Sequence, residues 1–351
     1  MQFKKKYLFN ALLIFFPISI ILWLNSIKGV PLFITSILSL IPIARIIGRA
    51  TEDLTIQTNP TIGGIFNATF GNIIELIIAI LAIRAGFIEL VKASLIGSII
   101  ANILLLIGLS IFIGGLKYKE QRFNTKSAGV SSTMLIIAVT GMAIPSIYSI
   151  ATGKEIAVLG YIVSVILAVI YIAGLIFALK THKHLFDVVE TYKREKIKPK
   201  WSIKQASIIL AVFVGLAALQ SELLITSIEE SSLKLGLTET FIGVVIIAIL
   251  TNLAEKTTAV RMALKNKIDI ALEIGTSSAT QIALFVVPIL IFISLIMARP
   301  FALVFNIFQL ISMIFAVMIV NYLSADGRCN WLEGAQLLTV YMILVVAFFF
   351  V

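Results

Sequence analysis

The sequence predicts an all-α polytopic membrane protein with eleven transmembrane helices: one extra N-terminal helix plus two inverted five-helix repeats. Three observations lead to this fold class. The 351 residues are 60% hydrophobic and only 13% charged, with a mean hydropathy of +1.07, whereas soluble domains contain about 25% charged residues. The apolar runs are about as long as a helix needs to cross a ~30 Å hydrocarbon layer. A short motif that ends in glutamate occurs twice, in different spans.

The predicted helices follow one another through short polar connections. Lys4, Lys5 and Lys6 precede the first apolar run, as in a signal peptide, but no Ala-x-Ala cleavage pattern follows it. We therefore expect the first run to be retained as a transmembrane helix. The eleven predicted spans cover residues 7–26, 31–50, 61–83, 93–115, 128–147, 156–179, 205–228, 239–262, 268–296, 300–323 and 333–351.

The chain divides into four predicted parts. Residues 1–28 form the N-terminal transmembrane helix, 29–180 the first five-helix repeat and 205–351 the second. Residues 181–204 are the one long polar connection. We expect a solvated cytoplasmic linker there, in which a part could form an amphipathic helix on the membrane surface.

The basic residues predict the orientation. With the N-terminus in the cytoplasm, 22 of the 28 Lys and Arg residues fall on the cytoplasmic side and 6 on the other. This bias follows the positive-inside rule and explains the net charge of +10 without a nucleic-acid partner. No organelle address is recognisable, so we expect a prokaryotic plasma membrane. The single cysteine, Cys329, excludes an internal disulfide and a thiolate metal cluster.

Two glutamates lie deep in predicted spans, within similar local sequences. Glu75 ends the motif Gly-Asn-Ile-Ile-Glu, and Glu255 ends Thr-Asn-Leu-Ala-Glu. An ionisable residue at bilayer depth is costly and indicates a functional site. Because five spans are an odd number, the second repeat enters the membrane from the opposite side. The two carboxylates then approach the midplane from either side, where inverted repeats place substrate sites.

A second pair of polar segments follows one span later in each half. Residues 97–102 align with residues 276–281 and add hydroxyl and amide side chains. Within each glutamate motif, the asparagine stands three residues before the glutamate and shares its helix face. Such oxygen ligands suit calcium best, because calcium accepts six to eight oxygens in irregular geometry. Manganese fits the same ligand types.

The net charge of the two glutamates predicts that the transport of Ca²⁺ is coupled to the transport of protons. Two ionised glutamates with one Ca²⁺ are neutral, and so are two protonated glutamates. Two bare carboxylates in a poorly hydrated site are opposed by desolvation and by mutual repulsion. We therefore expect only the calcium-loaded and proton-loaded forms to change sides readily, which makes the exchange obligatory.

The motifs also resemble a known family. Residues 64–77, Gly-Ile-Phe-Asn-Ala-Thr-Phe-Gly-Asn-Ile-Ile-Glu-Leu-Ile, resemble the first repeat motif of calcium/proton exchangers, the cation/proton exchanger family of the calcium/cation antiporter superfamily. Residues 252–288 resemble the second, with Asn-Leu-Ala-Glu, Thr-Ala-Val, Ala-Leu-Lys-Asn-Lys and Thr-Gln-Ile-Ala-Leu-Phe-Val-Val-Pro. The resemblance implies an eleven-helix antiporter that exports Ca²⁺ for H⁺ by alternating access. It also implies main-chain carbonyl ligands near Gly71 and Thr251.

The candidate residues fall into two groups, a cation site and a cation pathway. We expect no resident cofactor, because Ca²⁺ and H⁺ are the transported ions. The oligomeric state stays open. The expected cation site contains Glu75 and Glu255, which also bind the protons, with Asn72, Asn252, Gly71 and Thr251. The expected cation pathway contains Asn67, Ser98, Asn102, Ser278, Gln281 and Glu273.

Two residues depart from the family pattern. Lys256 stands where the family usually has histidine, and we expect it to extend toward the cytoplasm, although it could also act on the neighbouring glutamate. Glu273 replaces a small residue and is either an acid at the cytoplasmic entrance or a helix-start residue without a role in transport.

Other functions stay open as alternatives. A sodium-driven exchanger and a broader divalent exchanger that carries Mn²⁺ share the architecture, but neither repeat has the Gly-Ser-Ser-Ala-Pro-Glu motif of sodium/calcium exchangers. A cation channel is a weaker alternative, because an inverted repeat with paired acids fits a carrier better. A purely structural pair of protonated glutamates is a further alternative. We expect no enzyme, since no catalytic arrangement is recognisable.

Overall fold

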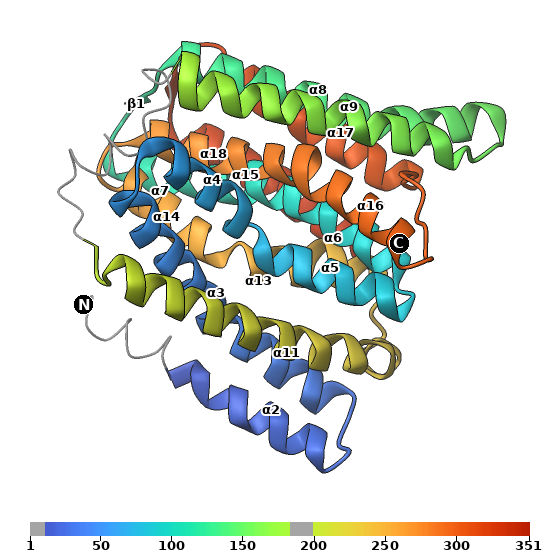
Figure 1. The fold of residues 1–351 in the computed structure, drawn as a ribbon. Helices are drawn as coiled ribbons and strands as arrows, with labels where there is room; N and C mark the ends of the chain where they lie inside the picture. The colour runs from blue at the N-terminus through green and yellow to red at the C-terminus, as the bar shows by residue number, and fades with distance from the viewer. Residues whose placement is uncertain (1–10, 183–198) are drawn as a thin grey trace.

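The computed structural model describes residues 11–182 and 199–351, and this part of the chain is almost entirely helical (Figure 1). The first half contains η1 (Leu12–Ile14), α2 (Phe15–Leu24), α3 (Val30–Gln57), α4 (Pro60–Phe70), α5 (Ile73–Ala85), α6 (Ile88–Ile100), η2 (Ala101–Leu106), α7 (Ile107–Lys117), β1 (Gln121–Arg122), α8 (Thr125–Thr152), α9 (Ala157–Ile176) and η3 (Phe177–Thr181).

The second half begins after the predicted linker 181–204, most of which lies outside the described residues. It contains α11 (Ile203–Leu235), α12 (Glu239–Phe241), η5 (Ile242–Ile247), α13 (Ala248–Thr251), α14 (Leu253–Ala263), α15 (Ile268–Gln281), η6 (Ile282–Val286), α16 (Val287–Ile296), α17 (Ile307–Leu323), β2 (Arg328–Cys329) and α18 (Trp331–Phe349).

Seven helices in the described part are long and apolar enough to cross a membrane, and an eighth results if one bent pair counts as a span. The bent pair is Glu239–Thr251 with Leu253–Ala263, whose axes differ by 57°. Two shorter apolar helices are Leu12–Leu24 and Ile307–Leu323. The prediction of an all-α multi-pass membrane protein is confirmed at this level.

The predicted span 61–83 is wrong as a continuous helix. The structure divides it into α4 and α5, which are separated at Gly71 and Asn72. The predicted span 300–323 begins later, at Ile307, because Asn306 caps that helix. Its side chain accepts from the Gln309 N–H while the Gln309 side chain accepts from the Asn306 N–H, and such a capping box fixes a helix start.

The helices form three layers (Figure 1). In the lower layer of the view, α3 packs along α11, with α2 against α3. In the upper layer, α8 packs against α9 and α17. The middle layer contains α5, α6 and α15, which carry Glu75, Ser98 and Ser278.

The helices α6 and η5 cross in backbone contact. A Cβ on Gly97 of α6 would lie 2.4 Å from the Cα and carbonyl oxygen of Val244 in η5. A Cβ on Gly243 would lie 2.7 Å from the Ala93 Cβ. Glycine is therefore required on both sides of this crossing, which brings the two halves together next to Ser98.

Two π-helical turns occupy similar places in the two halves. The turn η2 follows Ser98 and includes Asn102, and the turn η6 follows Ser278 and Gln281. A π-turn widens the helix by one residue and often lies near a functional site. Both turns stand beside candidate pathway residues.

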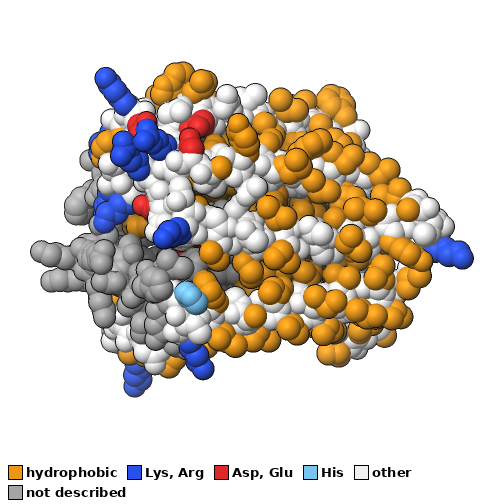
Figure 2. Space-filling model, turned by 90° about the horizontal axis from the view of Figure 1, so that it is seen from above, with side chains coloured by type: hydrophobic (Ala, Val, Ile, Leu, Met, Phe, Trp, Pro, Cys, Tyr) orange, Lys and Arg blue, Asp and Glu red, His pale blue; other side chains and the backbone are white. Residues whose placement is uncertain are grey.

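The surface separates charged and apolar regions. Figure 2 shows basic and acidic side chains gathered toward the left-hand end, whereas apolar side chains cover most of the rest of the described surface. Many large apolar side chains are exposed on α8, α9 and α18, among them Ile166, Val169 and Ile343. Such a surface fits contact with lipid.

The charged end is tied together by specific bonds. The buried carboxylate of Asp53, near the end of α3, accepts hydrogen bonds from the backbone N–H groups of Lys200 and Trp201 and pairs with Arg49. It therefore fixes the start of α11 to the end of α3. Nearby, β1 pairs with β2 in antiparallel register, with Gln121 opposite Cys329.

Candidate cation-binding site

The site is built on two interrupted helices. Asn72 and Asn252 both leave helical geometry, with φ values of −108° and −97°, and each is followed by a new helix. Glu75 and Glu255 stand in the first turn of these new helices. A carboxylate is favoured there, because the free N–H groups of a helix start carry partial positive charge. Both interruptions thus present an acid toward the inside of the bundle.

The two glutamates belong to one electrostatic cluster. Glu75 is buried, and Glu255 is half-buried. The charge of Glu75 acts on Glu255, whose other neighbours are Ser278 and Lys256. Glu75 in turn lies beside Thr251 and Asn252 of the opposite half. The sequence-based prediction that the two acids approach each other inside the protein agrees with this arrangement.

A hydrogen-bond network joins the two halves around the glutamates. The Asn72 Nδ2 donates to Gln281 Oε1 at 2.9 Å, and the Asn102 Nδ2 donates to Ser278 Oγ at 2.8 Å. Ser278 Oγ donates to Asn72 Oδ1 at 3.4 Å. At the second helix interruption, Asn252 Nδ2 donates to Ser98 Oγ of the first half at 3.4 Å.

Several oxygen atoms in this network have no donor. Among the described residues, both oxygens of Glu75, Oε2 of Glu255, and Oδ1 of Asn102 and Asn252 are buried and accept no hydrogen bond. Buried acceptors are usually paired, because desolvation without a partner costs free energy. Five unpaired oxygens on residues of the two helix interruptions and of η2 are a donor set for a hard cation.

Gly71 and Thr251, the two predicted main-chain ligands, lie at the helix interruptions. Gly71 ends α4, and a Cβ there would lie 2.6 Å from the Asn67 carbonyl oxygen and 3.7 Å from Gln281 Oε1. The first of these distances is too short for a Cβ, so glycine is needed at this position because of the Asn67 carbonyl, whereas the second is an ordinary contact. Thr251 ends α13 and its hydroxyl donates to the Ile247 carbonyl at 3.0 Å. Its backbone carbonyl stays a predicted ligand.

The remaining pathway residues lie on one side of the glutamates. Asn67 is exposed on α4, and Glu273 is half-buried on α15. Glu273 stands one turn before Ser277, whose hydroxyl accepts from Gln281 Nε2 at 3.2 Å. Neither Asn67 nor Glu273 joins the hydrogen-bond network itself. Ser277 belongs to the polar 276–281 segment, whose hydroxyl and amide side chains the sequence analysis assigned to the site.

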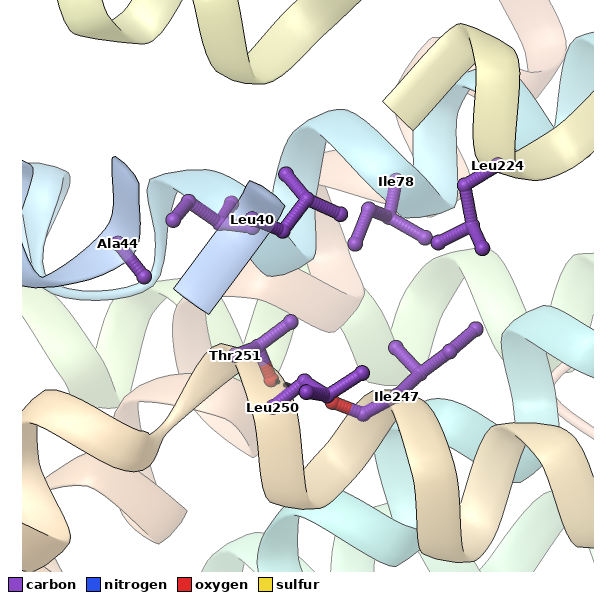
Figure 3. Close-up of a pocket in the computed structure, with 8 residues that line it drawn as sticks. Leu40, Ala44, Ile78, Leu224, Ile247, Leu250 and Thr251 are labelled. Atoms are coloured by element: carbon purple, nitrogen blue, oxygen red, sulfur yellow. Dashed lines mark hydrogen bonds between the residues drawn. The ribbon is translucent and has the colours of Figure 1, made fainter. Parts of the chain in front are cut away.

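Apolar side chains pack beside Thr251 of the site (Figure 3). There a small pocket of about 10 Å³ lies between α3, α5, α11 and η5, which is about the minimum space for one water molecule. Leu40, Ile78, Leu224 and Ile247 converge on it, and Thr251 also lines it. The apolar side chains around this pocket are called the apolar seal.

Lys256 does not extend toward the cytoplasm, so that expectation is wrong. Its side chain is 5% exposed. The ammonium donates to the backbone carbonyls of Ala248 at 3.2 Å and Ile249 at 3.4 Å, back across the helix interruption. Side chains of a helix lean toward its N-terminus, which brings the ammonium within reach of these carbonyls.

The described residues contain no second candidate metal site made of several carboxylate, thiol or imidazole side chains. In residues 11–182 and 199–351, no group of three or more His, Cys, Asp and Glu side chains could hold a metal ion. A cation at the site would therefore rely on two carboxylates together with amide, hydroxyl and main-chain oxygens.

Comparison with known proteins agrees with this picture. The profile of the family described as "Sodium/calcium exchanger protein" matches residues 28–180 and 206–350. The chain belongs to this family. It is 41% identical over 338 residues to the Ca(2+)/H(+) antiporter ChaA of Bacillus subtilis (strain 168), covering 95% of this chain and 96% of that protein. It is 40% identical over 367 residues to a Ca(2+)/H(+) antiporter of Aphanothece halophytica, covering 99% and 97%.

A solved structure is also similar to this exchanger-family chain. The Ca2+/H+ antiporter protein YfkE, solved in a selenium-substituted form, superimposes with a TM-score of 0.86 at 38% sequence identity, covering 98% of this chain and 100% of that one. Each stretch that the family profile matches contains one interrupted helix and one glutamate of the site, Glu75 in the first and Glu255 in the second.

Proposed function

We propose that this protein is a secondary active antiporter that exports Ca²⁺ in exchange for H⁺, and not an enzyme. The single observation that carries the proposal is the set of five unpaired buried oxygens, two of which belong to Glu75 and one to Glu255. The names of the similar proteins point to the same ions. Carboxylate oxygens bind either a divalent cation or protons, so one site can serve both ions.

The exchange follows from charge conservation at the site. Replacing Ca²⁺ by two protons leaves the total charge of the cluster unchanged. An empty pair of ionised glutamates differs from both loaded forms by two negative charges, which a poorly hydrated site opposes. The loaded forms therefore change sides more readily than the empty form, and each ion can return only in exchange for the other.

The fold supports alternating access by two inverted repeats. If α2 and α17 cross the membrane, and if the interrupted pairs α4–α5 and α12–α14 each form one span, the described helices make eleven spans. The family profile matches two stretches of similar length, one on each side of the linker. Inverted repeats of five spans each would place Glu75 and Glu255 near the bilayer midplane.

The proposed orientation puts the N-terminus and the charged end in the cytoplasm of a prokaryotic cell. Basic residues gather at that end, as the positive-inside rule requires. Asn67 and Glu273 then face the cytoplasmic side, whereas the apolar seal of Leu40, Ile78 and Leu224 faces outward. In this state the protein would accept Ca²⁺ from the cytoplasm.

Transport in proteoliposomes tests the proposal. The wild type should take up Ca²⁺ when a pH gradient is imposed, and a sodium gradient should not replace it. Glu75→Gln and Glu255→Gln should each lower the uptake rate at least a hundredfold, because glutamine keeps the shape but binds neither ion as a carboxylate does. Glu155→Gln, at an exposed position between α8 and α9, is the matched control and should transport normally.

Each outcome decides a different point. Normal uptake by both site variants would remove the glutamates from the mechanism. Uptake that follows the sodium gradient would replace the proton by sodium as the driving ion. Mn²⁺ uptake at a rate similar to Ca²⁺ would make the protein a broader divalent exchanger.

A further inference from the structure

The most unusual charge in the protein is that of Lys256. Its ammonium is buried beside the cation site and bonds to two backbone carbonyls, Ala248 and Ile249. These carbonyls belong to the last turn before the helix interruption, where partial negative charge accumulates. Lysine side chains commonly bind the final carbonyls of a helix, so the geometry explains how a positive charge is held inside the membrane.

The first half of the protein lacks this charge. The residue at the corresponding position, directly after Glu75, is Leu76. At both interruptions an asparagine precedes a glutamate by three residues, but only in the second half does a cationic residue follow the glutamate directly. The two halves of the site are electrically unequal.

The ammonium acts on the glutamates without pairing closely with them. The negative charges of Glu255 and Glu75 both act on the Lys256 ammonium. The close ion pairs found among the described residues do not include it. Glu75 keeps both oxygens unpaired. Lys256 therefore adds positive charge to the site and leaves the carboxylate oxygens available to a cation.

We propose that Lys256 is an affinity-setting residue, a tethered cation whose charge weakens the binding of the transported divalent ion. The inference rests on the proposed cation site. With two ionised glutamates, the cluster carries one net negative charge instead of two. Repulsion grows with the charge of the bound ion, so Lys256 weakens Ca²⁺ binding and favours release, and it disfavours more highly charged ions further.

The ammonium also limits which oxygens can reach the ion. The Ala248 carbonyl accepts from both Lys256 and the Asn252 amide, at 3.2 Å and 3.3 Å. This carbonyl is already satisfied and does not act as a ligand. The coordination sphere is then built from the unpaired side-chain oxygens and from carbonyls nearer the interruption.

Calcium titration of the purified full-length protein tests the inference. Lys256→Gln removes the charge but keeps a donor for the helix end, and Lys256→Met removes both. At fixed pH and ionic strength, both variants should bind Ca²⁺ at least about tenfold more tightly than the wild type. Lys256→Arg keeps the charge and should bind like the wild type. Leu76→Met, at the corresponding neutral position, is the control and should leave the affinity unchanged.

A trivalent ion separates charge from structure. If the effect is electrostatic, a tenfold gain for Ca²⁺ corresponds to about a thirtyfold gain for La³⁺, because the repulsion scales with ionic charge. A purely structural role would shift both affinities by one common factor. Lys256→Gln that stays folded and binds Ca²⁺ no more tightly than the wild type would overturn the inference. A wild type that binds no Ca²⁺ would instead overturn the proposed function.

Discussion

The two polar atoms of the Asn102 amide group have different surroundings. Its nitrogen donates to Ser278 of the opposite half, and its oxygen is buried without a donor. The first contact orients the side chain, and the second atom is thereby free to face a cation. A residue that both joins the halves and offers a ligand should be sensitive to truncation.

Replacing Asn102 by alanine should lower Ca²⁺ uptake in proteoliposomes at least tenfold, because it removes one ligand and one bond between the halves. Asn321→Ala is a suitable control. It removes a comparable bond, from Ser132 of α8 to Asn321 of α17, away from the site. Equal losses in the two variants would mean that Asn102 acts only through packing.

Cys329 provides a second test at the residue scale. Its thiol is 2% exposed in β2, and burial raises its pKa to about 12, with the charges of Glu333 and Asp326 acting in the same direction. The thiolate, which is the reactive form, is therefore almost absent at neutral pH. The folded state favours the protonated thiol, so any stability it contributes is lost only as the pH rises toward the folded-state pKa.

We expect maleimide to label the native protein very slowly at about pH 8 and to label it fully after unfolding in SDS. Mass spectrometry measures the modified fraction. Rapid labelling of the folded protein would contradict the burial of the Cys329 thiol.

The sequence was most informative about individual residues of the site. Glu75, Glu255 and the two asparagines could be predicted because the same motif occurs twice and a buried acid is rare in a membrane. The direction of the Lys256 side chain could not be predicted in the same way. It depends on the carbonyl groups of Ala248 and Ile249, which precede the helix interruption and accept from the Lys256 ammonium. The expectation that a membrane lysine extends toward water takes no account of such acceptors.

At the scale of elements, the crossing of α6 with η5 is a critical contact, because Gly97 and Gly243 let the two backbones touch beside the site. Gly97→Ala should lower the free energy of unfolding by more than about 2 kcal/mol, since the added Cβ meets backbone atoms that cannot move aside. Gly215→Ala in α11 has open space around the new Cβ and should stabilise by about 0.5–1 kcal/mol.

Thermal unfolding in detergent, monitored by circular dichroism, measures the difference between the two variants. Similar melting temperatures would show that the α6–η5 contact can relax. The comparison is matched because each variant adds a single methyl group within a helix.

At the level of helices, the main feature that the hydropathy pattern did not predict is their interruption. An apolar window averages over Gly71 and Asn72, so residues 61–83 were predicted as one helix although the structure divides them. The local change depends on side chains that bond across the bundle, such as Asn72 to Gln281. These partners are far apart in the sequence and become visible only in three dimensions.

At the scale of the whole molecule, the proposal requires one open and one closed side. Asn67 is exposed, and Ile78 is buried in the apolar seal. In a Cys329→Ser background, Asn67→Cys should react with a membrane-impermeant thiol reagent only from the cytoplasmic side. Ile78→Cys should be protected from both sides in the resting state.

Labelling of inside-out and right-side-out vesicles measures this difference. Reaction of the Asn67→Cys variant from the outside would contradict the proposed orientation. Reaction of the Ile78→Cys variant from the outside would mean that the outward-facing state prevails.

The most direct test of the central claim is the pH dependence of Ca²⁺ affinity. Protons and Ca²⁺ compete for the carboxylates of Glu75 and Glu255, so a calcium titration of the wild type should show progressively weaker binding from about pH 8 to about pH 4, because an ordinary glutamate takes up its proton at about pH 4.3. The competition should disappear together with measurable binding when both glutamates are replaced by glutamine. An affinity that stays constant across this range would contradict the account.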